Sequence, residues 1–326
     1  MNPTVEIILC TYNGSAYILE QIQSILRQSR PVDKISIHDD CSADETPSVI
    51  ETFLNGLSLQ ERSLFSVFIN EKNLGYAGNF SNAISHATGD ILFLCDQDDI
   101  WEQDKVEKLL SYFHGNSPDM VFSDGMPVDS EGQIIGKTTV LGSYGLTASD
   151  IAHFEQNAFK HLLKRNYING AAIAIKRESA QKALPLPCDM PHDYWLAIWC
   201  SLHDGIKVTS NLLYKYRLHR NNVIGIGQNR LIYGLLSAWR HADFPREKDL
   251  HIWKSVLSRI ESLPRPEEIN ATRHKLNWLS SVVAVKKRSL IRAARILRSV
   301  LNGKYNQFSS NFALFRDISS LLKSKS

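Results

Sequence analysis

The chain has 326 residues, of which 43% are hydrophobic and 22% are charged, and its formal net charge is +3 at pH 7. This composition excludes a generally disordered chain and is typical of a globular enzyme with one large core or two modest ones. The five cysteines are odd in number and show no CxxC spacing, so neither a disulfide framework nor a zinc site is expected.

The first 125 residues alternate short β-rich runs with helical patterns, which is typical of a parallel α/β sheet. In such a sheet, ligands bind beyond the carboxyl ends of the strands, so the residues that follow each strand are candidates for function. Strands are expected over residues 5–10, 34–38, 65–69, 91–94 and 120–122, and helices over 16–27, from near 46, from near 79 and over 105–113.

The pattern loosens over residues 125–146, where we expect turns and short strands. A new apolar run covers 171–175, and a helix is expected to begin at His192 and to end near residue 202. Residues 212–219 alternate like a strand. The N-terminal residues lack a basic stretch that leads into an apolar run, and nowhere do about 18 apolar residues follow one another, so we expect a cytoplasmic protein.

The charge is distributed unevenly. From Ala271 to Ser326 there are 12 Lys and Arg residues against one acid, Asp317, and apolar residues fall between them near helical spacing. This pattern fits an amphipathic helix on an anionic membrane surface, and equally the solvated face of helices packed on a catalytic domain. A nucleic-acid partner is not expected, because the body of the chain is acidic and no recognition motif accompanies the tail.

Three carboxylates lie within four residues, at Asp96, Asp98 and Asp99, directly after a buried-strand run. They repel one another, so a bound Mg²⁺ or Mn²⁺ shared with substrate phosphates explains them better than capping of the next helix. A calcium EF-hand is excluded, because Ile100 and Trp101 stand where a ligand and a glycine are required. Two earlier strand ends also carry polar residues, 11–14 and 39–42, for which a plain turn or a helix cap remains an alternative.

Taken together, these segments resemble the inverting glycosyltransferases of family 2, whose fold is called GT-A. The resemblance covers residues from about 4 to 225, and it departs from the family at Cys41-Ser42, where Gly-Ser is common, and at Gly78-Asn79, where an arginine often precedes the asparagine. The matching segments are Thr11-Tyr12-Asn13, Asp39-Asp40-Cys41-Ser42, Asn73-Leu74-Gly75 with Asn79, Thr88-Gly89-Asp90-Ile91, and Asp96-Gln97-Asp98-Asp99-Ile100-Trp101.

The resemblance implies roles for individual residues. Thr11, Tyr12, Asn13 and Asn79 would bind the nucleotide, with Asp40 on a pyrimidine base. Asp96 would lie between the ribose and the metal, and Asp98 would be the principal metal ligand.

The second half resembles the rhamnosyltransferase-like branch through His192-Asp193-Tyr194-Trp195 and Tyr216-Arg217-Leu218-His219-Arg220-Asn221-Asn222. By resemblance, Asp193 would be the catalytic base, although an acid at a helix start is also a common cap. His219 would complete the metal shell or touch the diphosphate, with a surface histidine as the alternative. By resemblance, Asn169 and Gly170 would lie beside the acceptor or donor sugar. Trp101, Tyr194 and Trp195 are candidates for stacking on a sugar ring, with a core role for part of this cluster as the alternative, because Trp199 follows Trp195 by one helical turn.

We therefore expect a GT-A catalytic domain over 1–228, with a nucleotide-binding half (1–125) and an acceptor half (126–228), and a basic helical region over 229–326. The expected reaction transfers a sugar, first of all rhamnose from dTDP-rhamnose or else a sugar from a UDP donor, to a glycan or lipid-linked glycan of a bacterial surface polysaccharide. The alternatives are a sugar nucleotidyltransferase, which would need a glycine-rich basic loop that residues 11–15 lack, and an inactive nucleotide-sugar-binding module.

Overall fold

The computed structural model describes residues 2–115, 117–219, 246–283 and 290–309, together with 314, 317 and 318. The described residues between 2 and 156 and between 167 and 219 form one compact unit, and 157–166 with the residues from 246 onward form a second. The expected domain boundary after residue 228 lies outside the described residues, as do Arg220, Asn221 and Asn222.

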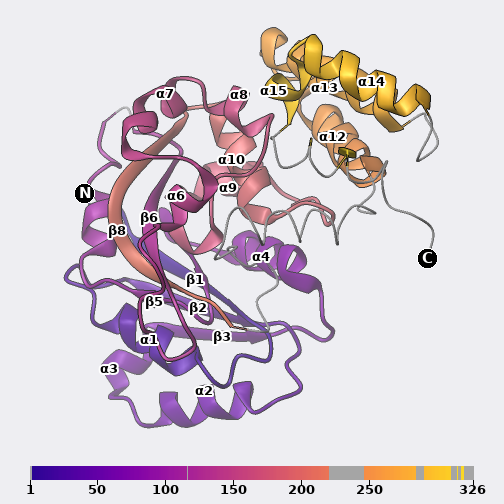
Figure 1. Cartoon of the computed structure of the whole chain (residues 1–326). Coiled ribbons are helices and arrows are strands. Elements are labelled where there is room, and N and C mark those ends of the chain that lie inside the picture. The colour runs from indigo at the N-terminus through magenta and orange to yellow at the C-terminus, as the bar shows by residue number, and fades with distance from the viewer. Residues whose placement is uncertain are drawn as a thin grey trace. The chain divides into compact units, whose positions relative to one another are not determined.

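A mixed sheet forms the centre of the first unit (Figure 1). Its order among the described strands is β3-β2-β1-β4-β7-β6-β8-β5; β1 to β4 are parallel to their neighbours in that group, whereas β7 runs antiparallel to both β4 and β6. The strands are β1 (Val5–Thr11), β2 (Lys34–Asp39), β3 (Phe65–Ile69), β4 (Ile91–Asp96), β5 (Ile100–Trp101), β6 (Met120–Val128), β7 (Ile173–Lys176) and β8 (Ile206–Arg217).

Strands β1 and β4 read as continuous apolar runs because helices cover the sheet on both faces. Every residue of β1 is buried, and so are the first five residues of β4. In the first unit the helices are α1 (Ile18–Leu26), α2 (Thr46–Asn55), α3 (Leu59–Arg62), α4 (Gly75–His86), α5 (Lys105–Leu110), α6 (Val140–Tyr144), α7 (Ile151–Gln156), α9 (Arg177–Lys182) and α10 (His192–Ser201), with short 3₁₀ turns η1 (Ala148–Asp150) and η2 (Gly170–Ala172).

The register of the parallel strands brings their carboxyl ends together. Thr11 at the end of β1 pairs with Asp39 of β2, and Cys10 pairs with Asp96 of β4. Residues that are 28 to 86 positions apart in sequence therefore meet at one edge, as the strand assignments predicted.

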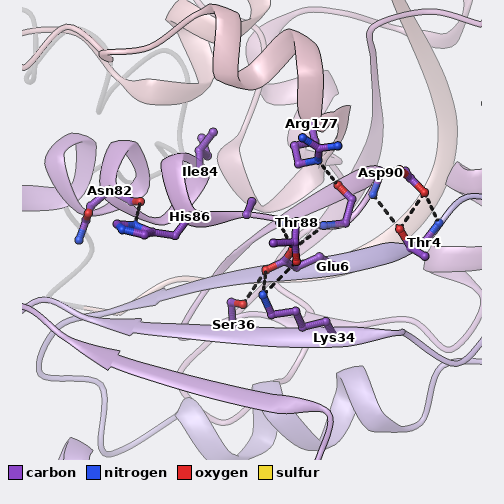
Figure 2. Close-up of polar contacts among 12 residues, drawn as sticks. Thr4, Glu6, Lys34, Ser36, Asn82, Ile84, His86, Thr88, Asp90 and Arg177 are labelled. Atoms are coloured by element: carbon purple, nitrogen blue, oxygen red, sulfur yellow. Dashed lines mark hydrogen bonds and ion pairs between the residues drawn. The ribbon is translucent and has the colours of Figure 1, made fainter.

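A buried carboxylate, that of Glu6, lies at the opposite edge of the sheet. Glu6 of β1 is fully buried and accepts hydrogen bonds of 2.7 Å from the main-chain N–H groups of Thr88 and Gly89 and one of 2.6 Å from Ser36, while Lys34 lies 3.1 Å away (Figure 2). A Cβ at residue 89 would approach the Glu6 Cβ within 2.6 Å, so only glycine fits there. The Thr88-Gly89 part of the motif therefore has a structural role, far from the ligand edge.

The expected sequence of elements is confirmed in outline. β6 continues to Val128, into the stretch where turns and short strands were expected, because Gly125 makes room for the ring of Tyr214 and the pairing with β8 shifts register there. β8 begins at Ile206, six residues before the expected start, and β7, which lies outside the 125 residues for which a parallel sheet was expected, adds antiparallel pairings.

Helices α8 (Ala158–Leu162), α12 (Arg246–Ile260), α13 (Pro266–Val283), α14 (Leu290–Leu301) and α15 (Lys304–Phe308) make up the second unit. Trp278 of α13 is buried against Tyr305 and Phe308 of α15, and the ammonium group of Lys275 lies 3.9 Å from the centre of the Trp253 ring. The basic tail thus contains the helices expected from its spacing. Within the described part of the chain, no helix combines the length and the apolar character needed to span a membrane.

Candidate active site

The loops after β1 and β4 are joined by one amide side chain, that of Gln97. Its Oε1 accepts hydrogen bonds from the Thr11 hydroxyl (2.6 Å) and the Tyr12 main-chain N–H (2.8 Å), and its Nε2 donates to the Tyr12 carbonyl (3.1 Å). A Cβ at residue 14 would clash with Gln97, which explains the glycine there. The sequence reading quoted Gln97 within the acidic motif but gave it no role.

Residues 12 and 13 differ in what they offer a ligand. The side chain of Tyr12 is 46% exposed, so its ring has a free face at this edge of the sheet. Asn13 has a φ of 50°, and its Oδ1 accepts a hydrogen bond from the Ala43 N–H while its own N–H donates to Ser42 Oγ. Asn13 thereby fastens the loop after β1 to the loop after β2, and its amide is largely used within the protein.

Asp40 is held from one side. Its Oδ1 accepts hydrogen bonds of 2.8 Å from the Asn70 side chain and from the Leu74 main-chain N–H. Asn79 supports the contact between Asn70 and Asp40. Its Oδ1 accepts a hydrogen bond from the Asn70 side chain, and its Nδ2 donates one to the His38 carbonyl. Asn79 is 2% exposed and supports Asp40 through Asn70, and its contact with a nucleotide stays a prediction.

The three clustered carboxylates have different environments. Asp96 is partly exposed, and burial together with the charges of Asp98 and Asp193 raises its pKa to about 7. Asp99 is 1% exposed, and burial and Asp98 raise its pKa well above the ordinary value. Since Asp99 also accepts a hydrogen bond from the Arg217 main-chain N–H (3.1 Å), it points into the protein and orients the loop. Asp96 and Asp98 remain for a ligand.

His219 approaches the second of these carboxylates. Its Nε2 lies 2.8 Å from Asp98 Oδ2, and its ring stacks on Tyr17 with 4.9 Å between centroids. The structure thus brings His219 to the acidic motif, as the sequence predicted, and adds Tyr17, which the sequence reading missed because it precedes a helix without any motif.

The donor set fits Mg²⁺ or Mn²⁺. Carboxylate oxygens suit these hard cations, which are commonly bound by one or two carboxylates and completed by substrate phosphates and water. Among the described residues, no group of three or more His, Cys, Asp or Glu side chains is assembled as a ready cage. Asp98 and Asp96, with His219 beside them, would hold such an ion jointly with a diphosphate.

Arg217 lies under the acidic loop and is 2% exposed. Its Nε donates to the Asp98 carbonyl (2.9 Å), and its terminal nitrogens reach the Ser130 carbonyl and Glu20 Oε2. Its guanidinium also lies 4.8 Å from the centre of the Tyr17 ring. These contacts show that Arg217 fixes the acidic loop.

Asp193 faces the acidic motif from the first turn of α10. Its charge contributes to the raised pKa of Asp96 and, after burial, to the raised pKa values of Tyr76 and Tyr144. An effect of one carboxylate on all three groups means that all three lie near Asp193. Asp193 itself is 8% exposed.

Asn169 and Gly170 lie in a turn next to Asp96. The Asn169 side chain accepts a hydrogen bond from the Ala171 N–H (2.9 Å) and shares another with Tyr144. A Cβ on Gly170 would be 3.7 Å from Asp96 Oδ2. The contact of both residues with a sugar stays a prediction.

Two of the expected sugar-stacking aromatics are core residues instead. Trp195 is fully buried, and its indole N–H donates to the Ala183 carbonyl (2.8 Å). Trp101 is 4% exposed and is covered by the ammonium group of Lys105, 3.9 Å from its ring centre. The burial of both rings favours the core role that the sequence left open for part of this cluster. Tyr194 is half-buried, and its contact with a sugar stays a prediction.

Comparisons with known proteins agree with this geometry. The profile of Glycosyl transferase family 2 matches residues 6–182. The putative teichuronic acid biosynthesis glycosyltransferase TuaG of Bacillus subtilis is 33% identical over 39% of this chain and 51% of its own length. The dTDP-rhamnosyl transferase RfbG of Shigella flexneri is 34% identical over 31% of this chain and 35% of its own. The chain thus spans about half the length of TuaG and a third of RfbG.

Solved structures share the fold. The mannosyltransferase PcManGT from Pyrobaculum calidifontis, in complex with GDP-Man and Mn²⁺, superposes with a TM-score of 0.55 at 16% identity, over 99% of this chain and 87% of that one. TarS 1-349 of S. aureus in complex with UDP gives 0.51 at 17% identity, over 92% of both chains. With its strand-end motifs, its GT-A fold and the family profile over more than half of its length, the chain belongs to glycosyl transferase family 2.

Proposed function

We propose that the protein is an inverting glycosyltransferase that transfers a sugar from a nucleoside-diphosphate donor to a hydroxyl group of a glycan or lipid-linked glycan. The observation that carries the proposal is the closeness of Asp193 to Asp96, whose pKa it helps to raise, together with the Asp98–His219 pair in the same acidic motif. A leaving diphosphate and an attacking hydroxyl need opposite sides of the anomeric carbon, and the proposal assigns the diphosphate to Asp96 and Asp98 and the hydroxyl to Asp193.

In this reaction Asp193 accepts the proton of the acceptor hydroxyl. The acceptor oxygen forms a bond to the anomeric carbon while the bond from that carbon to the diphosphate oxygen breaks, so the configuration inverts. A divalent cation supplies positive charge to the departing diphosphate when it is bound. Tyr12, Asn13 and Asp40 orient the nucleotide at the ends of β1 and β2.

The donor is proposed to be dTDP-rhamnose, in the synthesis of a bacterial surface polysaccharide. Support comes from RfbG, whose name states a dTDP-rhamnosyl transferase, and from TuaG, whose name states a teichuronic acid role. PcManGT and TarS were solved with GDP-Man and UDP, so the base is the first property to test.

A thermal-shift panel tests the donor class. The protein is titrated with dTDP-, UDP- and GDP-sugars, with and without Mn²⁺. A ligand at about 100 times its Kd stabilises the folded state by about 2.7 kcal/mol, which is readily seen as a rise in Tm. If none of these compounds raises Tm when Mn²⁺ is present, the protein does not use a nucleotide sugar.

Asp193→Asn tests the base. The variant should keep the Tm rise on nucleotide-sugar binding and lose about 10²-fold or more in turnover, because proton transfer to a positioned carboxylate contributes about that factor. Asp189→Asn is the matched control, since Asp189 is an exposed carboxylate close enough to raise the pKa of Tyr76. Unchanged turnover in Asp193→Asn would refute the assignment.

The basic helices of the 229–326 region are proposed to bind the cytoplasmic face of the inner membrane. On α14, Leu297 is 60% exposed and Leu301, one turn later, is 77% exposed, while Arg295 and Arg298 are exposed on the same helix. Exposed leucines with neighbouring arginines suit an interface of anionic lipids.

Vesicle co-sedimentation tests this surface. The full chain should sediment with phosphatidylglycerol vesicles and less with phosphatidylcholine vesicles, and Leu297→Glu with Leu301→Glu should abolish the difference. Leu59→Glu is the control, because Leu59 is 92% exposed in the other compact unit. Equal sedimentation of wild type and double variant would show that α14 serves only to pack.

A further inference from the structure

The residue before Asp193 is a buried histidine. His192 is 5% exposed, and within the part of the chain that the structure describes neither Nδ1 nor Nε2 makes a hydrogen bond. Its ring stacks on Phe80 of α4 with 3.9 Å between centroids, and burial lowers its pKa to about 3. A phenylalanine would pack equally well without two unpaired polar atoms, each of which costs about 1–3 kcal/mol. The imidazole is therefore kept for something other than packing.

The nearest feature of the site is the turn at Gly170. A Cβ on this residue would be 2.6 Å from His192 Nε2 and 3.7 Å from Asp96 Oδ2. Both atoms therefore lie on the side of Gly170 that a Cβ would occupy. Because glycine has no side chain, the imidazole nitrogen and the Asp96 carboxylate border the same turn.

An exposed aromatic ring stands on the other side of His192. Tyr76, in the first turn of α4, is 40% exposed, and its ring centroid lies 6.3 Å from that of His192. Burial and the charges of Asp193 and Asp189 raise the pKa of Tyr76, so its hydroxyl is close to the proposed base. Tyr76, His192 and Phe80 form a row of rings that joins α4 to the start of α10.

We propose that Tyr76 and His192 form the subsite for the transferred sugar, with the Tyr76 ring against an apolar face of the sugar and the neutral imidazole hydrogen-bonded to one of its hydroxyls. This inference rests on the proposed function, because in an in-line displacement the transferred sugar lies between the diphosphate at Asp96 and Asp98 and the base Asp193. A neutral imidazole offers one donor and one acceptor, as a hydroxyl does, whereas a phosphate would call for a cation.

The test compares each nucleotide with its sugar nucleotide. Dissociation constants of UDP, dTDP and GDP, and of UDP-glucose, dTDP-rhamnose and GDP-mannose, are measured by calorimetry with Mn²⁺ for the full chain. For each base, the Kd of the nucleotide divided by the Kd of its sugar nucleotide measures how much the sugar contributes to binding. His192→Phe keeps the ring stack and removes both nitrogens, and Tyr76→Ala removes the aromatic face.

Each variant should lower this ratio by about tenfold, because the loss of one hydrogen bond or one aromatic contact of about 1.4 kcal/mol weakens binding of the sugar by that factor. The constant for the bare nucleotide should stay within about twofold, as independent sites behave additively. Tyr76→Phe should restore most of the ratio because it keeps the ring. Phe68→Ala is the control, an aromatic of the same 40% exposure on β3.

His192→Phe carries a second readout. Because it removes two unpaired buried polar atoms, its Tm should equal or exceed that of the wild type. A variant that loses Tm and binds nucleotide and sugar nucleotide equally weakly would show a structural role and overturn the proposal, as would an unchanged ratio in both variants. Failure of the proposed function looks different, because then the wild-type protein binds none of the six compounds.

Discussion

His219 Nε2 lies 2.8 Å from Asp98 Oδ2, although the two residues are 121 positions apart in the sequence. The contact joins the end of β8 to the acidic loop after β4, and the imidazole is further held by its stack on Tyr17. An imidazole in this position either shares a cation with Asp98 or orients the carboxylate that binds it.

Replacing His219 by Phe should weaken the Mn²⁺-dependent part of nucleotide binding by about 10- to 100-fold, the usual cost of losing a residue that ligates a metal or orients its ligand. The ring keeps its stack on Tyr17, so Tm without ligand should change little. Calorimetry with the nucleotide at several Mn²⁺ concentrations measures the effect. Asp98→Asn should lose more than His219→Phe, and the reverse order would contradict the assignment of Asp98 as principal ligand.

Arg217 should be far more important for stability than its partner Glu20. Arg217→Met leaves the carbonyls of Asp98 and Ser130 without their donors inside the protein, at a cost of about 3 kcal/mol. Glu20→Gln should cost less than about 1 kcal/mol, because the Glu20 side chain is 49% exposed and its ion pair is screened by water. Urea unfolding of the two variants gives both free energies. Similar losses would mean that the guanidinium does not hold the loop.

Cys41 adopts a left-handed conformation, with a φ of 62°, in the loop after β2. Cys41→Gly should raise the free energy of unfolding by about 0.5–1 kcal/mol, since glycine relieves strain of about 1–2 kcal/mol and gives back part of it as chain entropy. Cys41→Ala keeps the strain and should gain nothing. Chemical denaturation compares them, and an equal gain from alanine would locate the effect in the thiol.

Stability should fall as the pH drops below about 6.5. His38 is 1% exposed, and burial lowers its pKa from the ordinary value of 6.5 to about 4. Between pH 6.5 and pH 4, His38 is therefore protonated in the unfolded chain and neutral in the folded chain. The free energy of unfolding then decreases by at most about 1.4 kcal/mol per pH unit for this residue.

Urea unfolding at pH 7, 6 and 5 measures the slope, and His38→Phe removes this residue's share while keeping the stack on Phe68. The difference between variant and wild type isolates His38 from the carboxyl groups that titrate in the same range. Parallel slopes would show that folding does not lower the pKa of His38.

The sequence predicted the strands that are buried on both faces, because such strands leave continuous apolar runs. The sequence did not predict features that depend on contacts between residues distant in the chain. β6 continues through Gly125 and Pro127, which read as turn residues, and Gly125 is accommodated because the Tyr214 ring packs over it. β7 has apolar residues like its parallel neighbours, so nothing in its composition reveals that it runs antiparallel.

Candidate site residues were found where they directly follow a strand, as Asp40 and Asp96 do, because strand ends can be read from the sequence. The roles of His192, Gln97 and Lys105 could not be found in this way. Each depends on partners between 66 and 112 residues distant, such as Ala171 for Lys105, and no local pattern records them. A lysine on the otherwise apolar face of α5 was the one available signal, and it indicates a buried charge near the acidic loop.

The hydrogen bonds of Gln97 to Thr11 and Tyr12 have a consequence for exchanging parts between related enzymes. The loops after β1 and β4, which are separated by more than 80 residues, hold each other in position through these bonds. Gly14 is part of the same arrangement, because a side chain there would collide with the Gln97 amide. A chimera that receives a foreign loop after β1 should misplace its acidic loop unless residue 97 is transplanted with it.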